Sequence, residues 1–370
     1  MSNITAGGTV YGLYFTGTNP TVYENTIYNV TGSGTMYSLY DGGTGTTYCY
    51  RNKVSNITNN SATAGLYGLY VSTGTSNNIY NNYVSELYAP NLSSTSINLS
   101  GIYINGGTAI GVFYNTVYLN ATSVGANFGS SAIYASSTPT VELRNNIFVN
   151  NSTPNGSGLA VAYRRSSTTI GTYSANSNNN DFLAATIYND GTTSYPTITD
   201  FKNLVSPIDN ASFSELPPFV NVAAMPYDLH IGTTTETQCE SGGSVVSTEA
   251  AISITNDYDN NARFPNPGYP DNPSYPAIAP DVGADEFAGR PKDLIGPSIS
   301  FSPLGNTAST SARTLTAEIT DPSGVPTSGL GLPVLYWRIN AGAWSSATAT
   351  SLGSNQYQFS FGAGVSLSNI

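Results

Sequence analysis

Tyrosines recur at a nearly constant spacing along the first half of the chain, each closing a triplet of a small residue, an aliphatic residue and Tyr. Successive tyrosines of this set are 26, 30, 33, 31 and 29 residues apart: Tyr14, Tyr40, Tyr70, Tyr103, Tyr134 and Tyr163. Aromatic rings repeated along one side of a rod could stack sugar rings, since each has an apolar body and a polar tip. The spacing therefore predicts a ligand-binding tyrosine stripe, with an aromatic stack in the core or under a loop as the alternative.

A run of oxygen-bearing side chains later in the chain has the spacing of a calcium loop. Asp257, Asp259 and Asn261 lie at alternate positions, as the first oxygen ligands of Ca²⁺ loops do, and they are the predicted metal ligands. No glutamate follows at the distance that an EF-hand requires. The alternative is that these residues cap turns and pair with Arg263. Calcium is the only cofactor that the sequence suggests.

The acidic residues of the repeat region are not arranged for catalysis. Glycosidases need two converging carboxylates, and lyases need a base beside a metal ion or a basic clamp. The four acids that precede residue 181 occupy unlike positions in the repeat: Glu24, Asp41, Glu86 and Glu142. We therefore predict no catalytic residue in this region and no turnover of acidic glycans.

The charge distribution argues against nucleic acid as a partner. The net charge is −11, and residues 181–293 carry sixteen of the acids against four bases, so the chain has no basic face for phosphates. No apolar run approaches the about 18 residues of a membrane span. We expect a monomer without a membrane span.

These residues must be positioned by a repeat of about 30 residues. About a dozen residues after each of the first five triplets comes Asn-x-(Ile/Val), beginning at Asn25, Asn52, Asn82, Asn115 and Asn145, and Asn180 begins a weaker sixth copy. Each repeat contains two or three short strand-like segments separated by Gly, Thr and Asn turns. A repeat of this kind predicts the stacked coils of a parallel β-helix, here over residues 1–190.

Stacked coils predict columns of equivalent residues. We interpret the Asn column as a buried ladder whose amides bond from coil to coil. Strand alternation would place the residues two positions after each Asn on the same inner face. It would place there too the residues two positions before each Asn, which are Tyr23, Tyr50, Tyr80, Phe113 and Leu143. The residues directly before each Asn would face outward, where Glu24 and Arg51 would form an exposed ion pair.

The rest of the sequence changes character twice. Residues 191–293 lose the period and become rich in proline, which is typical of irregular last coils and a cap over the open strand edge at the end of the rod. Residues 294–370 contain five alternating segments, which predict a partial β-sandwich of immunoglobulin or fibronectin type. Cys49 and Cys239 are expected to be buried thiols, with a disulfide between them as the alternative.

Three stretches of the middle segment resemble the closing part of a known group of proteins: residues 240–243, 254–263 and 280–287. The last two are similar to the Thr-x-Asp-x-Asp-Gly-x-x-Arg and Pro-Asp-Ile-Gly-Ala-x-Glu stretches of secreted right-handed parallel β-helix proteins of Bacteroidetes-type bacteria, in the pectin-lyase-like superfamily. Asn260 and Val282 depart from those patterns. The resemblance implies an all-β, right-handed parallel β-helix with a C-terminal cap, a following Ig-like module, here truncated, and export from the cell. It implies no single reaction.

These observations favour an extracellular or cell-surface module for adhesion or glycan binding, non-catalytic, with a polysaccharide or cell-surface glycan as its partner. The alternatives are a polysaccharide-active lyase or glycoside hydrolase with its site in residues 181–293, and a structural spacer. The residues after Met1 lack the basic and apolar regions of a signal peptide. We therefore expect the export signal to lie outside this sequence.

Overall fold

Strands make up nearly all of the regular structure in the computed structural model of the chain, which describes residues 4–94, 96, 98–246, 252–305 and 309–362. The chain forms two compact units, Met1–Lys292 and Asp293–Ile370. The first unit therefore includes both segments that the sequence divides near residue 190. In the described part of the chain, no helix has the length and apolar character needed to cross a membrane.

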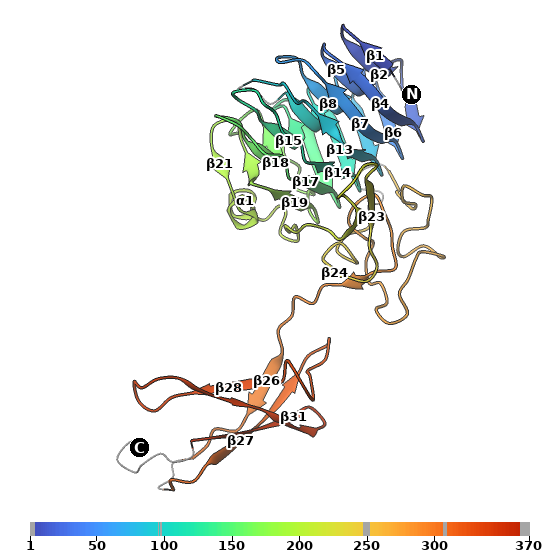
Figure 1. Ribbon diagram of the computed structural model, residues 1–370. Coiled ribbons are helices and arrows are strands. Elements are labelled where there is room, and N and C mark those ends of the chain that lie inside the picture. Colours follow the sequence, from blue (N-terminus) through green and yellow to red (C-terminus); the bar gives the residue numbers. More distant parts are fainter. Residues whose placement is uncertain (1–3, 95, 97, 247–251, 306–308, 363–370) are drawn as a thin grey trace. The chain divides into compact units, whose positions relative to one another are not determined.

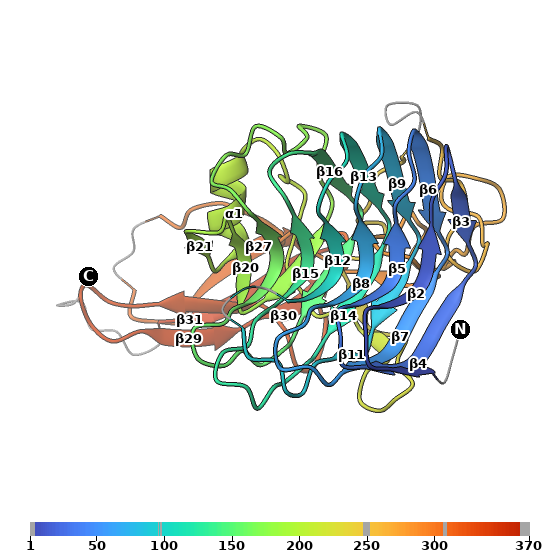
Figure 2. The ribbon, with the colours of Figure 1, turned by 90° about the horizontal axis from the view of Figure 1, so that it is seen from above.

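Successive coils of the first unit add parallel strands to the same three sheets, which makes a parallel β-solenoid of about 6 turns (Figures 1 and 2). The first sheet contains β2 (Val10–Phe15), β5 (Met36–Asp41), β8 (Leu66–Val71), β12 (Leu99–Ile104), β15 (Ser130–Ala135), β18 (Ala160–Arg165) and β20 (Thr186–Asn189), with β21 (Ser194–Tyr195) pairing antiparallel at its edge. The second contains β1 (Ile4–Ala6), β4 (Thr26–Gly32), β7 (Lys53–Asn59), β10 (Tyr83–Ser85), β14 (Thr116–Leu119), β17 (Ile147–Asn150) and β19 (Asp181–Ala184), and β11 (Leu87–Tyr88) also pairs with β7. The third contains β3 (Thr21–Tyr23), β6 (Thr46–Tyr50), β9 (Ser76–Tyr80), β13 (Ala109–Phe113) and β16 (Thr140–Arg144).

The small residue of each triplet has a packing role. At Gly68 and Gly101 a Cβ atom would lie 2.6 and 2.4 Å from the side chains of Val84 and Val117, which line the opposite wall of the core. The same Cβ atoms would lie 2.5 and 2.6 Å from a backbone carbonyl of the next coil. Real Cβ contacts are not that short, so only the smallest side chains fit where the first sheet packs against the second.

A ladder of asparagine side chains runs through the interior, as the sequence predicts. The amide nitrogen of each donates to the amide oxygen of the next at 2.9–3.1 Å, through Asn25, Asn52, Asn82, Asn115, Asn146 and Asn180. The same oxygens also accept the backbone N–H of the preceding ladder residue at 2.9–3.1 Å. The amide nitrogens further bond carbonyls of the turn, so buried polar groups at the corner find partners within the ladder.

Two details of the predicted columns are wrong. The fifth rung is Asn146, not Asn145, because Asn145 has φ 58° and forms the turn before the rung. Five other residues directly before a rung also have positive φ: Glu24, Arg51, Asn81, Tyr114 and Asn179. A left-handed residue at the corner breaks strand alternation. The tyrosines two before the rungs therefore face outward, and the inner column is one residue earlier, where Cys49, Ile79, Val112 and Leu143 pair and are fully buried.

The ion pair predicted between neighbouring coils, Glu24 with Arg51, is present. The inner column after the rungs runs Ile27, Val54, Val84, Val117 and then Phe148 and Phe182. Both cysteines are free and buried, Cys49 in the main core and Cys239 in a separate cluster.

The end of the coil stack is closed by a short helix. Helix α1 (Ile198–Val205) begins with a capping box in which Thr197 and Asp200 bond each other's backbone N–H groups. Its buried residues, Phe201 and Val205, pack on the aromatic end of the main core. A cap at this end was expected, and the helix provides it.

The rest of the expected cap lies elsewhere. The described residues of 213–292, which we call the covering segment, pack along the outer face of the second sheet and not over the end of the rod (Figure 1). The segment contains β22 (Phe219–Asn221) and β23 (Asp228–Ile231), which pair antiparallel, and β24 (Glu236–Thr237) and β25 (Arg290–Pro291), which pair parallel. Its apolar side chains bury Tyr83, Tyr118, Ile147 and Val149, so an outer sheet face becomes a second core.

Arg263 fastens this segment to the coils. Its side chain is 1% exposed, and its guanidinium group donates to Glu286 at 2.9 Å and to Asn81 of the coils at 3.0 Å. The same group lies 4.0 Å above the ring of Tyr114. A buried charge needs a partner of opposite sign, and Glu286 supplies it.

The second unit is antiparallel. A four-stranded sheet has the order β26 (Ser298–Phe301), β27 (Arg313–Thr320), β31 (Gln356–Phe361) and β30 (Thr350–Gly353), and β28 (Val334–Trp337) pairs with β29 (Ser345–Thr348). Its small core contains Ala317, Ile319, Ala349, Tyr357 and Phe359. The arrangement is compatible with a partial β-sandwich.

Replacing a central rung should weaken the solenoid. In Asn82→Leu the neighbouring amide of Asn52 and the carbonyl of Cys49 lose their partner, and unsatisfied buried groups cost about 1–3 kcal/mol. We expect the free energy of unfolding, from urea titration, to fall by this amount. The exposed Asn176 serves as control, because Asn176→Leu should leave it within about 0.5 kcal/mol. Equal urea midpoints and equal slopes of the unfolding free energy for Asn82→Leu and Asn176→Leu would contradict the role of the ladder.

Removing the buried guanidinium should cost more than removing an exposed one. Arg263→Met leaves Glu286 buried without a counter-ion, which costs about 3–5 kcal/mol. Arg290→Met breaks the exposed pair with Glu236 and should cost about 0–1 kcal/mol. Urea titration of both proteins measures the difference. A loss for Arg263→Met no larger than that for Arg290→Met would show that the covering segment is held by apolar contacts alone.

Candidate functional site

Eight tyrosines form a continuous surface on the outer face of the first sheet, which we call the tyrosine array. One column of paired positions contains Tyr14, Tyr40, Tyr70, Tyr103 and Tyr134, and a second, three residues earlier on the same strands, contains Tyr11, Tyr37 and Tyr67. Both columns face outward because strand alternation is interrupted at the small residue of the triplet, which is buried together with the aliphatic residue that follows it. The array is therefore twice as wide over the first three coils as the sequence predicts.

Tyr163 does not belong to the array. It pairs with Ile133 and is fully buried against Tyr173 and Phe182, whereas Arg164 pairs with Tyr134 and takes the outward position. The triplet in this coil is shifted by one residue relative to the others. The predicted stripe is thus outward for five of its six tyrosines, and a cation follows its last ring.

The rings stack on one another along the array. Tyr40, Tyr70, Tyr103 and Tyr134 have successive centroid separations of 5.1, 5.2 and 4.3 Å and interplanar angles of 16° or less. Tyr37 stacks on Tyr11 and Tyr67 at 5.1 and 5.4 Å. Because neighbouring rings cover each other's faces, the array presents ring edges and phenol hydroxyls to the surroundings. It can exchange hydrogen bonds and make edge contacts, but it offers few free faces for the sugar stacking that the sequence suggests.

The four acids of the coils have structural partners. Asp41 is buried and accepts from Thr47, Asn77 and the backbone of Gly43 at 2.7–2.9 Å, although burial raises its pKa. Glu24 pairs with Arg51, and the backbone N–H of Tyr227 donates to Glu86 at 3.2 Å. Glu142 accepts from Arg144 at 2.6 Å. None of these four carboxylates is positioned beside the array as an acid–base group.

The predicted calcium ligands have separate partners in the structure. Asp257 is buried, and its two oxygens accept the backbone N–H groups of Asn261 and Glu286 at 2.7 and 3.1 Å. Asp259 instead pairs with His230 at 2.7 Å. The contacts of Asp257 are those of a turn-closing residue, and calcium binding by Asp257, Asp259 and Asn261 stays a prediction.

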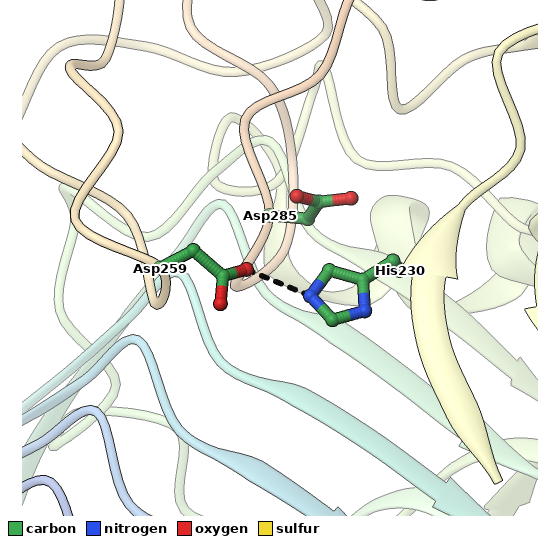
Figure 3. Close-up of side chains that lie close together, drawn as sticks. All are labelled: His230, Asp259 and Asp285. Atoms are coloured by element: carbon green, nitrogen blue, oxygen red, sulfur yellow. Dashed lines mark hydrogen bonds and ion pairs between the residues drawn. The ribbon is translucent and has the colours of Figure 1, made fainter.

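A different cluster lies beside them. His230, Asp259 and Asp285 each direct a potential metal-ligating atom into one space, and these atoms lie within 4.8 Å of one another (Figure 3). His230 comes from β23, Asp259 from the turn at residues 257–261, and Asp285 from the stretch that packs on the second sheet. Burial raises the pKa of Asp285 to about 6, and hydrogen bonds with Asp259 and then Asp228 raise the pKa of His230 to about 9.

The sequence predicts Asp259 as a metal ligand but does not join it to His230 and Asp285. The members of this cluster are 26 or more residues apart and no motif joins them; they meet only because three parts of the covering segment pack on the same sheet face. The one available signal was the chain's single histidine within an acidic segment.

No protein-family model, characterised protein or solved structure matches the chain. Its class is therefore defined by the fold: a parallel β-solenoid of about 6 turns, joined to an antiparallel β unit.

The tyrosine array should make the protein sensitive to alkali. Burial, with Coulomb contributions from Tyr37 and Tyr134, raises the pKa of Tyr67 to about 12, above the about 10 of an unfolded chain. The folded state then keeps a proton that the unfolded state loses, so this contribution to stability is present below pH 10 and is lost as the pH rises toward 12. Urea titrations at intervals from pH 8 to 11 measure the loss. Tyr67→Phe, which cannot ionise, should lose less stability over this range; an identical decline would contradict the shifted pKa.

Proposed function

We propose that the chain is a secreted or cell-surface β-solenoid module that binds a glycan without cleaving it, and that the tyrosine array is its binding surface. The observation that carries this proposal is the array itself: eight outward tyrosines at equivalent positions of successive coils. Surface tyrosines in a packed, regular group are a common means of recognising partners, because the rings bury area with little loss of conformational freedom.

The chemistry of the array suits a polyhydroxylated polymer. Each phenol hydroxyl can donate and accept one hydrogen bond, and the electropositive ring edges suit sugar oxygens. Coils repeat at about 4.7–4.9 Å, so a linear glycan lying along the rod would meet the same group again and again. Individually weak contacts of this kind add up through multivalency.

The binding role is favoured over hydrolysis or elimination because the coil acids already have partners. Asp41 closes a turn inside the core, and Glu24, Glu86 and Glu142 bond to a guanidinium group or a backbone N–H. Cleavage of a glycosidic bond would need two carboxylates, or a base with a clamp, next to the bound sugar.

The proposal extends to family and location. The stretches at 254–263 and 280–287 support a place in the pectin-lyase-like superfamily of exported bacterial β-helix proteins. The antiparallel strand pairing of residues 298–361 supports an Ig-like second unit. Both rest on resemblance and on fold, and the binding experiment below does not depend on them.

A matched pair of variants tests the array. Tyr40→Ala removes a ring that stacks within the array, while Tyr50→Ala removes a ring of the same coil that stacks between Tyr23 and Tyr80 on the third sheet. We expect the wild type to be retained on one or more insoluble polysaccharides or glycan-array spots. Affinity should fall at least threefold in Tyr40→Ala and stay unchanged in Tyr50→Ala. Circular dichroism and thermal melts confirm that both variants are folded.

Two outcomes would overturn the proposal. One is equal retention of both variants on every glycan that the wild type binds, because the array would then not be the surface. The other is release of reducing ends or unsaturated products by the wild type, because the module would then be an enzyme. Tyr40→Phe separates the contribution of the hydroxyl from that of the ring.

A further inference from the structure

His230 is held in the orientation of a metal-binding histidine. Its Nδ1 pairs with Oδ1 of Asp228, two residues earlier on β23, which leaves Nε2 directed at Asp259 (Figure 3). In metal sites the ring nitrogen that does not bind the ion usually donates to a carboxylate in this way, which fixes the ring and its tautomer. The backbone N–H of Ile231 likewise holds Oδ2 of Asp285 at 2.9 Å.

A buried hydroxyl without a partner lies next to this group. Tyr83 is 3% exposed, and its hydroxyl has no hydrogen-bond partner among the described residues. Its ring lies 5.4 Å from that of His230. The ring also lies 4.6 Å from that of Tyr258, the neighbour of Asp259 in sequence. A buried hydroxyl left unbonded is costly unless an ion, a bound water or another group completes its surroundings.

The charge balance also favours a cation. Three carboxylates, of Asp228, Asp259 and Asp285, surround one imidazole. Of the side-chain cations whose charges act on these carboxylates besides His230, Arg263 is already bonded to Glu286 at 2.9 Å, and Lys53 supplies a single positive charge from β7. Even a protonated imidazole leaves the group with an excess of negative charge, which a divalent ion would reduce.

We propose that His230 Nε2 and the carboxylates of Asp259 and Asp285 bind a divalent transition-metal ion, Zn²⁺ being the best match. One imidazole with two carboxylates suits Zn²⁺ better than Ca²⁺, which prefers six to eight oxygens. Tyr83 or a water hydrogen-bonded to it completes the fourth position. Bonds of about 2.0–2.2 Å place tetrahedral ligands about 3.3–3.6 Å apart. The three ligand atoms lie within 4.8 Å of one another, and His230 Nε2 and Asp259 Oδ2, which are 2.7 Å apart, would separate to admit the ion.

The ion would join three parts of the covering segment over the third coil, which contains β10. β23, the 257–261 loop and the 280–287 stretch contribute one ligand each, and β10 contributes Tyr83 from beneath. Since the unfolded chain does not hold these residues together, binding would stabilise the folded state. The role is structural, and it is independent of glycan binding by the tyrosine array.

Titration of chelator-treated protein tests the site. We expect isothermal calorimetry to show one Zn²⁺ per chain and the melting temperature to rise with Zn²⁺ but not with Ca²⁺ or Mg²⁺ at equal concentration. Co²⁺ should give the visible absorption of a four-coordinate site. His230→Gln and Asp259→Asn should each lower Zn²⁺ affinity at least tenfold. Asp271→Asn, an exposed acid of the same segment, should retain wild-type affinity.

Three results would overturn the proposal: no Zn²⁺ binding by the wild type, a response to Ca²⁺ alone, or equal affinity in His230→Gln. Circular dichroism in the presence of chelator shows whether a variant has folded. If His230→Gln does not fold, crystals of the wild type soaked in Zn²⁺ decide the question. An anomalous peak beside His230 Nε2 supports the site, and peaks only at other carboxylates contradict it.

Discussion

The asparagine ladder is the constraint on which the first unit depends. Each coil must turn a corner sharply enough to return above its starting point, and that corner leaves backbone groups in the core that no strand can satisfy. A side-chain amide both donates and accepts, so one residue per coil can bond to the turn and to the next rung at the same time. The ladder fixes the register of the coils, and from the register follow the apolar columns inside and the tyrosine columns outside.

The repeat, the parallel solenoid and the ladder could be predicted from sequence because each depends on residues within one coil and its neighbour. The errors are local and have two causes. A left-handed residue before each rung cannot be recognised from its type, since Glu24, Arg51 and Tyr114 all adopt it. If strand alternation continued through the corner, the tyrosines of the third sheet would face inward, as the sequence predicts. The second cause is a one-residue shift of the last coils relative to the repeat seen in the sequence. Because of it, the ladder residue is Asn146, and Arg164 takes the outward position predicted for Tyr163.

The cluster of His230, Asp259 and Asp285 and the position of the covering segment could not be predicted for a different reason. Both depend on contacts between residues far apart in sequence, such as Arg263 with Asn81. The proline-rich composition indicated correctly that the segment leaves the repeat, but composition does not tell which surface such a segment covers. The second sheet indicates which surface is covered. Its outward residues Tyr83, Ile147 and Val149 are apolar, where a solvated face would be polar.

That apolar outer face has a consequence for how the protein is made. Synthesis proceeds from the N-terminus, and the coils through β17 leave the ribosome before residues 213–287, which bury their side. For that interval, which is about 60 or more residues at about 5–20 residues per second, the nascent chain carries an exposed apolar face beside completed coils. A chaperone that shields this face during translation would then be displaced by the protein's own later residues.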